Sequence, residues 1–166
     1  RCEIVRLGRN SLLLRPARVR IAAGTEVRGA LSRLARRVGR NVVFSPDVAG
    51  GLPAFDIEER RLGPESIVEA ARSAGLHVCA VGSSLVVSAG PLAEPSWEPA
   101  AGLVRERVWC RGARAGDLFR ELALAAGRAL ILEGTGDVRV SADLERVALD
   151  EALVALATAH GYEVGS

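Results

Sequence analysis

The stretch LARRVGRNVVFSPDVAGG, residues 34–51, passes from one kind of structure to another within a few residues. Its first residues continue an apolar stripe of helical spacing, made of Val27, Ala30, Leu31, Leu34 and Val38. Gly39 then stands where a helix C-terminus needs a residue that tolerates positive φ. The apolar, branched run NVVF predicts a buried strand, and SPDVAGG predicts a turn. We therefore expect a helix over 27–38 followed directly by a strand over 41–44.

The same change occurs again in LALAAGRALILEGTG, residues 122–136. When Gly39 is placed on Gly127, the two halves align without a gap through the helix and the following apolar run. Farther along, GPESIVEAARSAGLHV aligns with ALDEALVALATAHGYEV, after a turn that is shorter in the second copy. The apolar positions coincide, as they do in a duplicated fold. The chain is therefore expected to contain an internal repeat.

Each copy predicts the order β-α-β-β-α. The expected elements of the first and second copies are a strand (19–22, 107–110), a helix (27–38, 115–126), a strand (41–44, 129–132), a further strand in PAFDIEE or DVRVSADLE, and a second helix (64–74, 149–160). In the first copy, LHVCAV and SLVVSA around GSS predict a hairpin. The second copy ends at YEVGS, after one strand of that hairpin.

These patterns predict an α+β protein made of two tandem β-α-β-β-α units, each a small mixed sheet packed against two helices. The first domain is placed at 1–90, where CEIVRL and NSLLLRP add two N-terminal strands that extend the first sheet. A Pro-rich linker is placed at 91–104 and the second domain, with its last hairpin incomplete, at 105–166.

Two sets of residues are singled out as candidate sites. Four glycines are expected to end helices as structural caps: Gly39, Gly75, Gly127 and Gly161. The alternating run VRVSADL predicts a half-buried strand whose edge is open in the second copy, and an open edge can pair with a partner strand. The candidate interaction edge comprises Val138, Arg139, Val140, Ser141 and Ala142.

Composition excludes several functional classes. The chain of 166 residues carries 22 Lys and Arg against 20 Asp and Glu, and this net charge of +2 gives no strong attraction to nucleic acid or to an anionic membrane. No apolar run approaches the roughly 20 residues that span a bilayer. Cys2, Cys79 and Cys110 lack the close spacings of metal or redox motifs and are expected to be small buried hydrophobes.

No constellation of chemically active residues is recognisable. His77 and His160 are the only histidines, and neither has a Cys, Asp or Glu at metal-ligand spacing. EGTGD contains Gly-x-Gly, but no helix N-terminus follows it as phosphate binding requires. Glu58, Glu59, Asp143 and Glu145 are expected to be solvated charges at strand ends. The chain is therefore predicted not to be an enzyme, with no catalytic, metal or cofactor-binding residues and no cofactor.

The first copy resembles the short N-terminal domain shared by bacterial secretins and signal-transducing TonB-dependent receptors. The family pattern is a strand, a Leu-rich helix, Gly-x-Asn with an apolar strand, a Pro-x-Val-x-Gly turn, a second helix and a hairpin after Gly-Leu. The matching residues are Gly39, Asn41, Pro46, Val48, Gly50, Gly75 and Leu76. The second copy departs from the pattern, because Ala129 replaces the Asn and its turn has no Pro.

The resemblance implies a non-enzymatic periplasmic module for protein interaction and assembly, in a secretin-like outer-membrane secretion or type IV pilus channel. Tandem copies fit this arrangement, in which the full-length protein forms a homo-oligomeric ring. Its partners would be inner-membrane secretion or pilus components or an exported protein, with outer-membrane contact only through other regions. The alternative is a periplasmic signalling domain of a TonB-dependent receptor or related regulator.

RNA binding by a KH-like unit is a weaker alternative. A KH site needs a Gly-x-x-Gly loop between two helices, whereas here a strand follows the first helix of each copy. The six aromatic residues also leave few platforms on which bases could stack. Arg33, Arg36, Arg37 and Arg40 could form a basic patch, but no nucleic-acid partner is expected.

Overall fold

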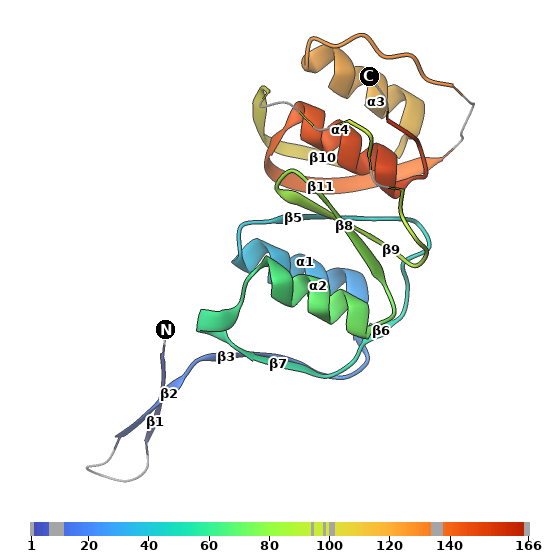
Figure 1. Cartoon of the computed structure of the whole chain (residues 1–166). Coiled ribbons are helices and arrows are strands. Elements are labelled where there is room, and N and C mark those ends of the chain that lie inside the picture. Colours follow the sequence, from blue (N-terminus) through green and yellow to red (C-terminus); the bar gives the residue numbers. More distant parts are fainter. Residues whose placement is uncertain are drawn as a thin grey trace.

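Helices and small sheets alternate along the chain in a computed structural model that describes residues 2–6, 12–93, 95–97, 99, 102–133 and 138–164. The protein is of the α+β class (Figure 1). The α-helices are α1 (Val27–Arg37), α2 (Pro64–Ser73), α3 (Ala115–Ala125) and α4 (Leu149–Ala159), and a short 3-10 helix, η1, covers Glu59–Arg61.

The strands form small sheets. They are β1 (Cys2–Arg6), β2 (Leu12–Pro16), β3 (Arg18–Ile21), β4 (Thr25–Glu26), β5 (Asn41–Phe44), β6 (Gly51–Leu52), β7 (Phe55–Glu58), β8 (His77–Val81), β9 (Ser84–Ser88), β10 (Val104–Arg114) and β11 (Arg139–Ala148). Antiparallel pairs join β1 to β2, β3 to β7, β4 to β6 and β10 to β11. The sheet β5-β9-β8 has β9 at its centre, parallel to β5 and antiparallel to β8.

The first half of the chain is layered. Helices α1 and α2 lie between the β3–β7 pair and the sheet β5-β9-β8 (Figure 1). The apolar stripe expected for α1 faces inward, and Leu31 and Leu34 are almost fully buried with Ile67 of α2. On β9, Leu85 and Val87 join this core, which therefore fills the space between the helices and one face of the sheet.

The ends of α1 follow directly from the sequence. At its start, the Glu26 carboxylate accepts hydrogen bonds from the backbone N–H groups of Arg28 (2.9 Å) and Gly29 (2.6 Å), which lack partners within the helix. After its end, Gly39 has φ +67°, and its counterpart Gly127 after α3 has φ +69°. Gly75 and Gly161 follow α2 and α4 with φ values of +76° and +77°. Each of the four lies just beyond a helix, in the left-handed region that favours glycine.

The second half packs on the opposite face of the same sheet. Val43 of β5, Val81 of β8 and Val86 of β9 belong to one core cluster with α3, α4, β10 and β11. Every residue of α4 is buried, which is the pattern of a helix covered on all sides. All five residues of β9 are buried as well, because α1 and α2 cover one face and α4 covers the other. The two halves therefore share a core.

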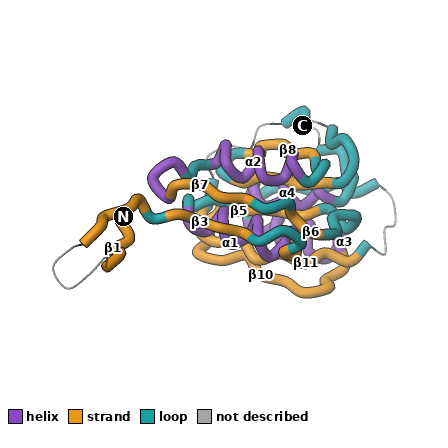
Figure 2. The backbone as a smooth tube through the Cα atoms, turned by 90° about the horizontal axis from the view of Figure 1, so that it is seen from below, coloured by secondary structure: helices purple, strands orange, loops and turns teal. Residues whose placement is uncertain are grey.

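Strands β10 and β11 lie on one side of the molecule, whereas β8 lies on the opposite side (Figure 2). Strand β11 runs beside the edge strand β5 and is bonded to it through a side chain described below. The order across the molecule is thus β8, β9, β5, β11 and β10, with a gap in the backbone ladder between β5 and β11.

Most expected elements are present within a few residues of their predicted bounds. The four helices, the strands over 19–22 and 41–44, the strand in PAFDIEE and the hairpin of β8 and β9 are confirmed. Strand β10 is longer than predicted, and β11 covers most of the predicted strand DVRVSADLE. None of the described helices combines the length and apolar character that a membrane span requires.

Some expectations are wrong. Residues 129–132 form no strand, and the second half reads β10-α3-β11-α4 in the described residues. The N-terminal strands β1 and β2 pair with each other and project from the body, instead of extending the first sheet (Figure 1). Residues 162–164 of YEVGS are loop. Residues 165–166, the 134–137 part of the EGTGD turn, and 94, 98, 100 and 101 of the expected linker lie outside the described residues.

Candidate interaction groove between the two halves

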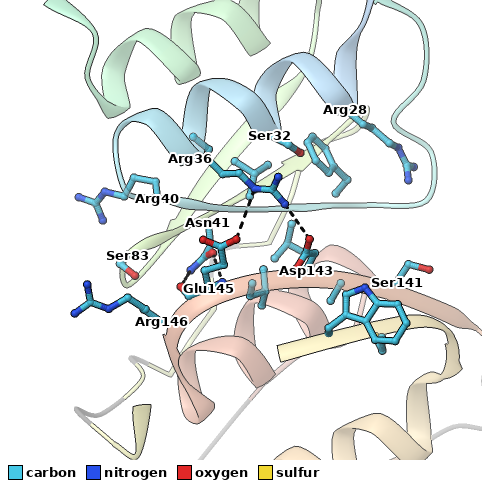
Figure 3. A pocket seen from close by; sticks show the side chains of 18 of the residues that line it. Arg28, Ser32, Arg36, Arg40, Asn41, Ser83, Ser141, Asp143, Glu145 and Arg146 are labelled. Atoms are coloured by element: carbon cyan, nitrogen blue, oxygen red, sulfur yellow. Dashed lines mark hydrogen bonds and ion pairs between the residues drawn. The ribbon is translucent and has the colours of Figure 1, made fainter. Parts of the chain in front are cut away.

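A groove of about 800 Å³ lies on the surface where the first half meets the second (Figure 3). One wall is formed by α1 and β5, and the other by β10 and β11. We call it the β5–β11 groove. Its walls include backbone edges, because β5 pairs only with β9 and β11 pairs only with β10 within the described chain. Each wall therefore offers N–H and C=O groups to a further extended segment.

Asn41 closes one end of the groove. Its Nδ2 donates to the carbonyl oxygen of Glu145 (2.9 Å), and its Oδ1 accepts from the N–H of the same residue (2.8 Å). The amide thus makes the two bonds that a neighbouring strand would make. This side chain ties β5 to β11 although their backbones do not form a ladder.

An ion-pair network crosses the groove. Arg36 of α1 reaches Asp143 of β11 at 2.9 Å and Glu145 at 3.9 Å (Figure 3). Arg107 of β10 contacts the other oxygen of Asp143 at 2.8 Å. The hydrogen bond from Arg107 lowers the pKa of Asp143, and the positive charge of Arg36 adds to the effect. Because these side chains are partly exposed, the network orients the groove walls more than it stabilises the fold.

Other arginines of the groove differ in how they are used. Arg28 donates to the carbonyl oxygens of Val48 (2.8 Å) and Ser45 (2.9 Å), so its guanidinium holds the turn after β5. By contrast, Arg40, Arg111 and Arg146 make no ion pair within the described part of the chain. The groove therefore carries uncompensated positive charge.

Trp109 gives the groove an exposed apolar wall. It lies on β10 directly opposite Asp143, and 62% of its surface is exposed. Val104, also on β10 and also lining the groove, is 57% exposed. Large apolar side chains with this exposure on one strand are candidates for partner contact.

A second set of polar contacts joins the halves through the β8–β9 hairpin. Glu151 of α4 is only 8% exposed, and its carboxylate accepts hydrogen bonds from the hydroxyl groups of Ser83 (2.8 Å) and Ser84 in the β8–β9 hairpin. The hydroxyls satisfy a carboxylate that would otherwise be buried at a large cost. The hairpin turn is thus anchored to the second half.

The linker is attached to the second half through an arginine. Arg128 pairs with the buried Asp150 of α4 at 2.8 Å, and its guanidinium lies 5.7 Å from the centre of the Trp97 ring. Ser96 donates to the carbonyl oxygen of Val164 (2.7 Å). Residues 96 and 97 of the expected linker therefore pack on the second half.

The candidate edge from Val138 to Ala142 is divided by the structure. Val140 is fully buried in the shared core, and Val138 and Ala142 are half-buried against it. Arg139 and Ser141 are exposed, and both contact Gly112 of β10. One edge of this stretch pairs with β10, and Ser141 and Ala142 line the groove. The edge thus forms part of the groove wall.

His77 and Cys79 lie two residues apart on β8, whereas Cys110 lies on β10 and His160 follows α4. His160 donates from Nδ1 to the carbonyl oxygen of Leu156 (2.9 Å) at the end of α4, in a tautomer assigned from this contact, and burial lowers its pKa. Cys110 is half-buried, and burial raises the pKa of its thiol. Cys79 is also half-buried, so neither of the two is the buried residue expected, and the burial of Cys2 lies outside what the structure describes. No group of three metal-ligating side chains occurs among the described residues.

Sequence reasoning missed several groove residues. Asp143 is not a solvated charge at a strand end: it lies within β11 and is held by two arginines. The arginine patch expected on α1 is split, because Arg36 and Arg40 line the groove whereas Arg33 and Arg37 face β3. The alternation of Arg105, Arg107, Trp109 and Arg111 was the available signal, since it places all four on one face of β10.

No family model, curated protein or solved structure matches this chain. The arrangement of the groove therefore has to be interpreted from its own chemistry. Backbone edges, uncompensated arginines and an exposed tryptophan are suited to binding and recognition.

Proposed function

We propose that this chain is a protein-interaction and assembly module of a secretin-like outer-membrane secretion or pilus channel, acting in the periplasm. In this proposal, the two halves are tandem units, of which the second lacks the strand after its first helix, and the full-length protein assembles into a homo-oligomeric ring. Inner-membrane components or an exported protein are the further partners.

The order of elements in the first half carries the proposal. Strand β3 leads into α1, Gly39 and Asn41 precede the apolar strand β5, and the Pro46 turn follows. Helix α2 is then followed by Gly75 and the β8–β9 hairpin. This is the order of the short N-terminal domain of secretins and TonB-dependent receptors that the sequence resembles.

The groove supports an interaction role. Its walls combine two strand edges with arginines and an exposed tryptophan, and protein partners can use all three. Asn41 has a position in the resembled pattern and also ties β5 to β11. A residue that holds the two halves together gives tandem units a fixed geometry, which ring assembly would require.

Sedimentation velocity tests the proposal. We expect weak self-association of this chain at high concentration, with contacts concentrated in residues 105–166, and a stable ring for the full-length protein extracted in detergent. Fractionation of cells that express the full-length protein should place its N-terminal region in the periplasm. A monomeric full-length protein would contradict the proposal.

A further inference from the structure

We infer that the β5–β11 groove binds an acidic, extended segment of a partner protein, whose carboxylates pair with Arg40 and Arg146 and whose apolar side chain rests on Trp109. The inference rests on the proposed assembly function and deepens it by naming the chemistry of the partner. It is carried by the charge and the exposed apolar surface of one groove.

The positive end of the groove is formed by residues from both halves. Arg40 follows α1 and Arg146 lies in β11, yet both lie at the end of the groove where Asn41 contacts Glu145, with Ser83 between them (Figure 3). Neither arginine makes an ion pair within the described residues. Two guanidinium groups without partners form a site that favours carboxylates, with which arginine makes strong, directed hydrogen bonds.

The carboxylates of the groove leave this charge uncompensated. Asp143 is engaged by Arg36 and Arg107, and Glu145 faces Arg36 at 3.9 Å. The groove walls also carry Arg40, Arg111 and Arg146, so positive side chains outnumber negative ones there. A partner with complementary negative charge is therefore favoured over a basic or neutral one.

Arg146 is held in an uncommon conformation. Its φ is +48°, in the left-handed region that non-glycine residues rarely adopt. The preceding residue, Glu145, is fixed through both backbone groups by Asn41. Residues held in such conformations are concentrated at functional sites. In this backbone conformation, the Arg146 side chain lies at the same end of the groove as Arg40.

Trp109 provides the apolar contact. It lines the groove together with Arg111, two residues along β10, and is 62% exposed. Tryptophan and arginine are the residue types most enriched at the energetic centres of protein interfaces. Backbone groups of β5 and β11 that pair with no strand in the described chain also face the groove.

A protein segment fits these features better than a nucleic acid does. Asp143 and Glu145 lie among the arginines, where an evenly charged phosphate backbone would meet like charge. A protein segment can alternate carboxylates with apolar side chains and so match both kinds of surface. The chain's net charge of only +2 also gives little non-specific attraction for a polyanion.

Fluorescence anisotropy with a labelled peptide tests the inference. The probe is a short fluorescein-labelled peptide of Asp and Glu around a central Leu, titrated with the full chain. We expect binding, no binding of the same peptide with Asn and Gln in place of the acids, and affinity about tenfold weaker in the double variant R40Q/R146Q or in W109A. The matched control R33Q/R37Q removes the same charge on the other side of α1 and should change affinity less than about twofold.

Several results would overturn the inference. They are no binding of the acidic peptide, equal weakening by the two double variants, or tighter binding of a single-stranded RNA oligonucleotide that is lost in R40Q/R146Q. Assembly of the full-length protein is measured separately. A ring that forms while the acidic peptide fails to bind overturns this inference alone, whereas groove-specific peptide binding by a monomeric full-length protein supports it and contradicts the proposed function.

Discussion

Residues 41–44 and 129–132 occupy equivalent positions in the two halves of the sequence, yet only the first forms a strand. In β5, Val43 is 3% exposed and packs against α4, while Val42 and Phe44 pack toward α1 and α2. In the second segment, Leu130 and Leu132 pack on the core, but Ile131 is 89% exposed. In both segments successive side chains point to opposite faces, but both faces are covered only in β5.

The difference lies in what surrounds each segment. Strand β5 pairs with β9 over its whole length, whereas residues 129–132 have no strand beside them in the described chain. Apolar, branched residues favour a strand, but the backbone groups still need partners on at least one side. A neighbouring strand, and not local composition, therefore decides which copy forms the strand.

The largest effect is expected from the equivalent substitutions Val43→Asp and Ile131→Asp. Val43→Asp buries an unpaired charge in the shared core and should lower the free energy of unfolding by about 3 kcal/mol or more. Ile131→Asp places its charge in water and should change the free energy of unfolding by less than about 0.5 kcal/mol. Denaturant unfolding of both variants measures the comparison. Equal losses would show that residues 129–132 are buried like β5.

A smaller effect is expected at the first position of each segment. Asn41→Ala removes both bonds to Glu145 and should destabilise the protein by about 1–2 kcal/mol, because two backbone groups lose their partner. Ala129→Asn, which restores the residue of the first copy, should change stability little, since no equivalent strand lies beside it. Chemical denaturation compares the two. An unchanged Asn41→Ala variant would mean that Asn41 does not tie β5 to β11.

The glycines that precede the two segments should behave alike. Gly39 and Gly127 have nearly the same φ, and nothing lies within 4 Å of a Cβ added to either. Substitution by Val should cost about 1 kcal/mol or more in each case through backbone strain alone. Melting temperatures of Gly39→Val and Gly127→Val test this. If only one variant is destabilised, the helix ends are not equivalent.

The smallest expected effect is a dependence of stability on pH that arises at the end of α4 and not at the equivalent end of α2. Burial lowers the pKa of His160, so the unfolded chain takes up this proton at a higher pH than the folded one. Stability should therefore fall as the pH drops through the ordinary histidine value of about 6.5, until the lower folded pKa is reached. Ala74 holds the equivalent position in the first half.

His160→Ala should remove this pH dependence, and the exposed His77→Ala serves as its control. Melting temperatures between neutral pH and mildly acidic pH measure the effect. A wild-type protein whose stability is flat over that range would contradict the assignment to His160.

Local elements were predictable because their causes are local. The helical stripe through Leu34, the caps at Gly39 and Gly127, and the hairpin around Ser83 all depend on neighbours close in the chain. The shared core was not predictable. The apolar runs around Val43 and Val86 indicate strands that are covered on both faces, but they do not indicate which element covers the second face. That face is covered by α4, which is distant in the sequence.

The groove was only partly predictable. Asn41 belongs to the resembled family pattern, and Arg36 and Arg40 belong to a run of arginines that is visible in the sequence. Their partners Asp143, Glu145 and Arg146 lie on a strand distant in the chain, and single-sequence periodicity carries no information on such pairings. Trp109 lies in a strand with an alternating side-chain pattern. Its exposure depends on which face of β10 packs against the core.

Hydrogen–deuterium exchange of residues 41–44 and 129–132 in the same protein measures whether only the first segment has a strand partner. We expect slow exchange for those amides in 41–44 that bond to β9, and exchange near the rate of an unstructured chain throughout 129–132. Comparable protection of both segments would contradict it, because residues 129–132 would then have a strand partner of their own.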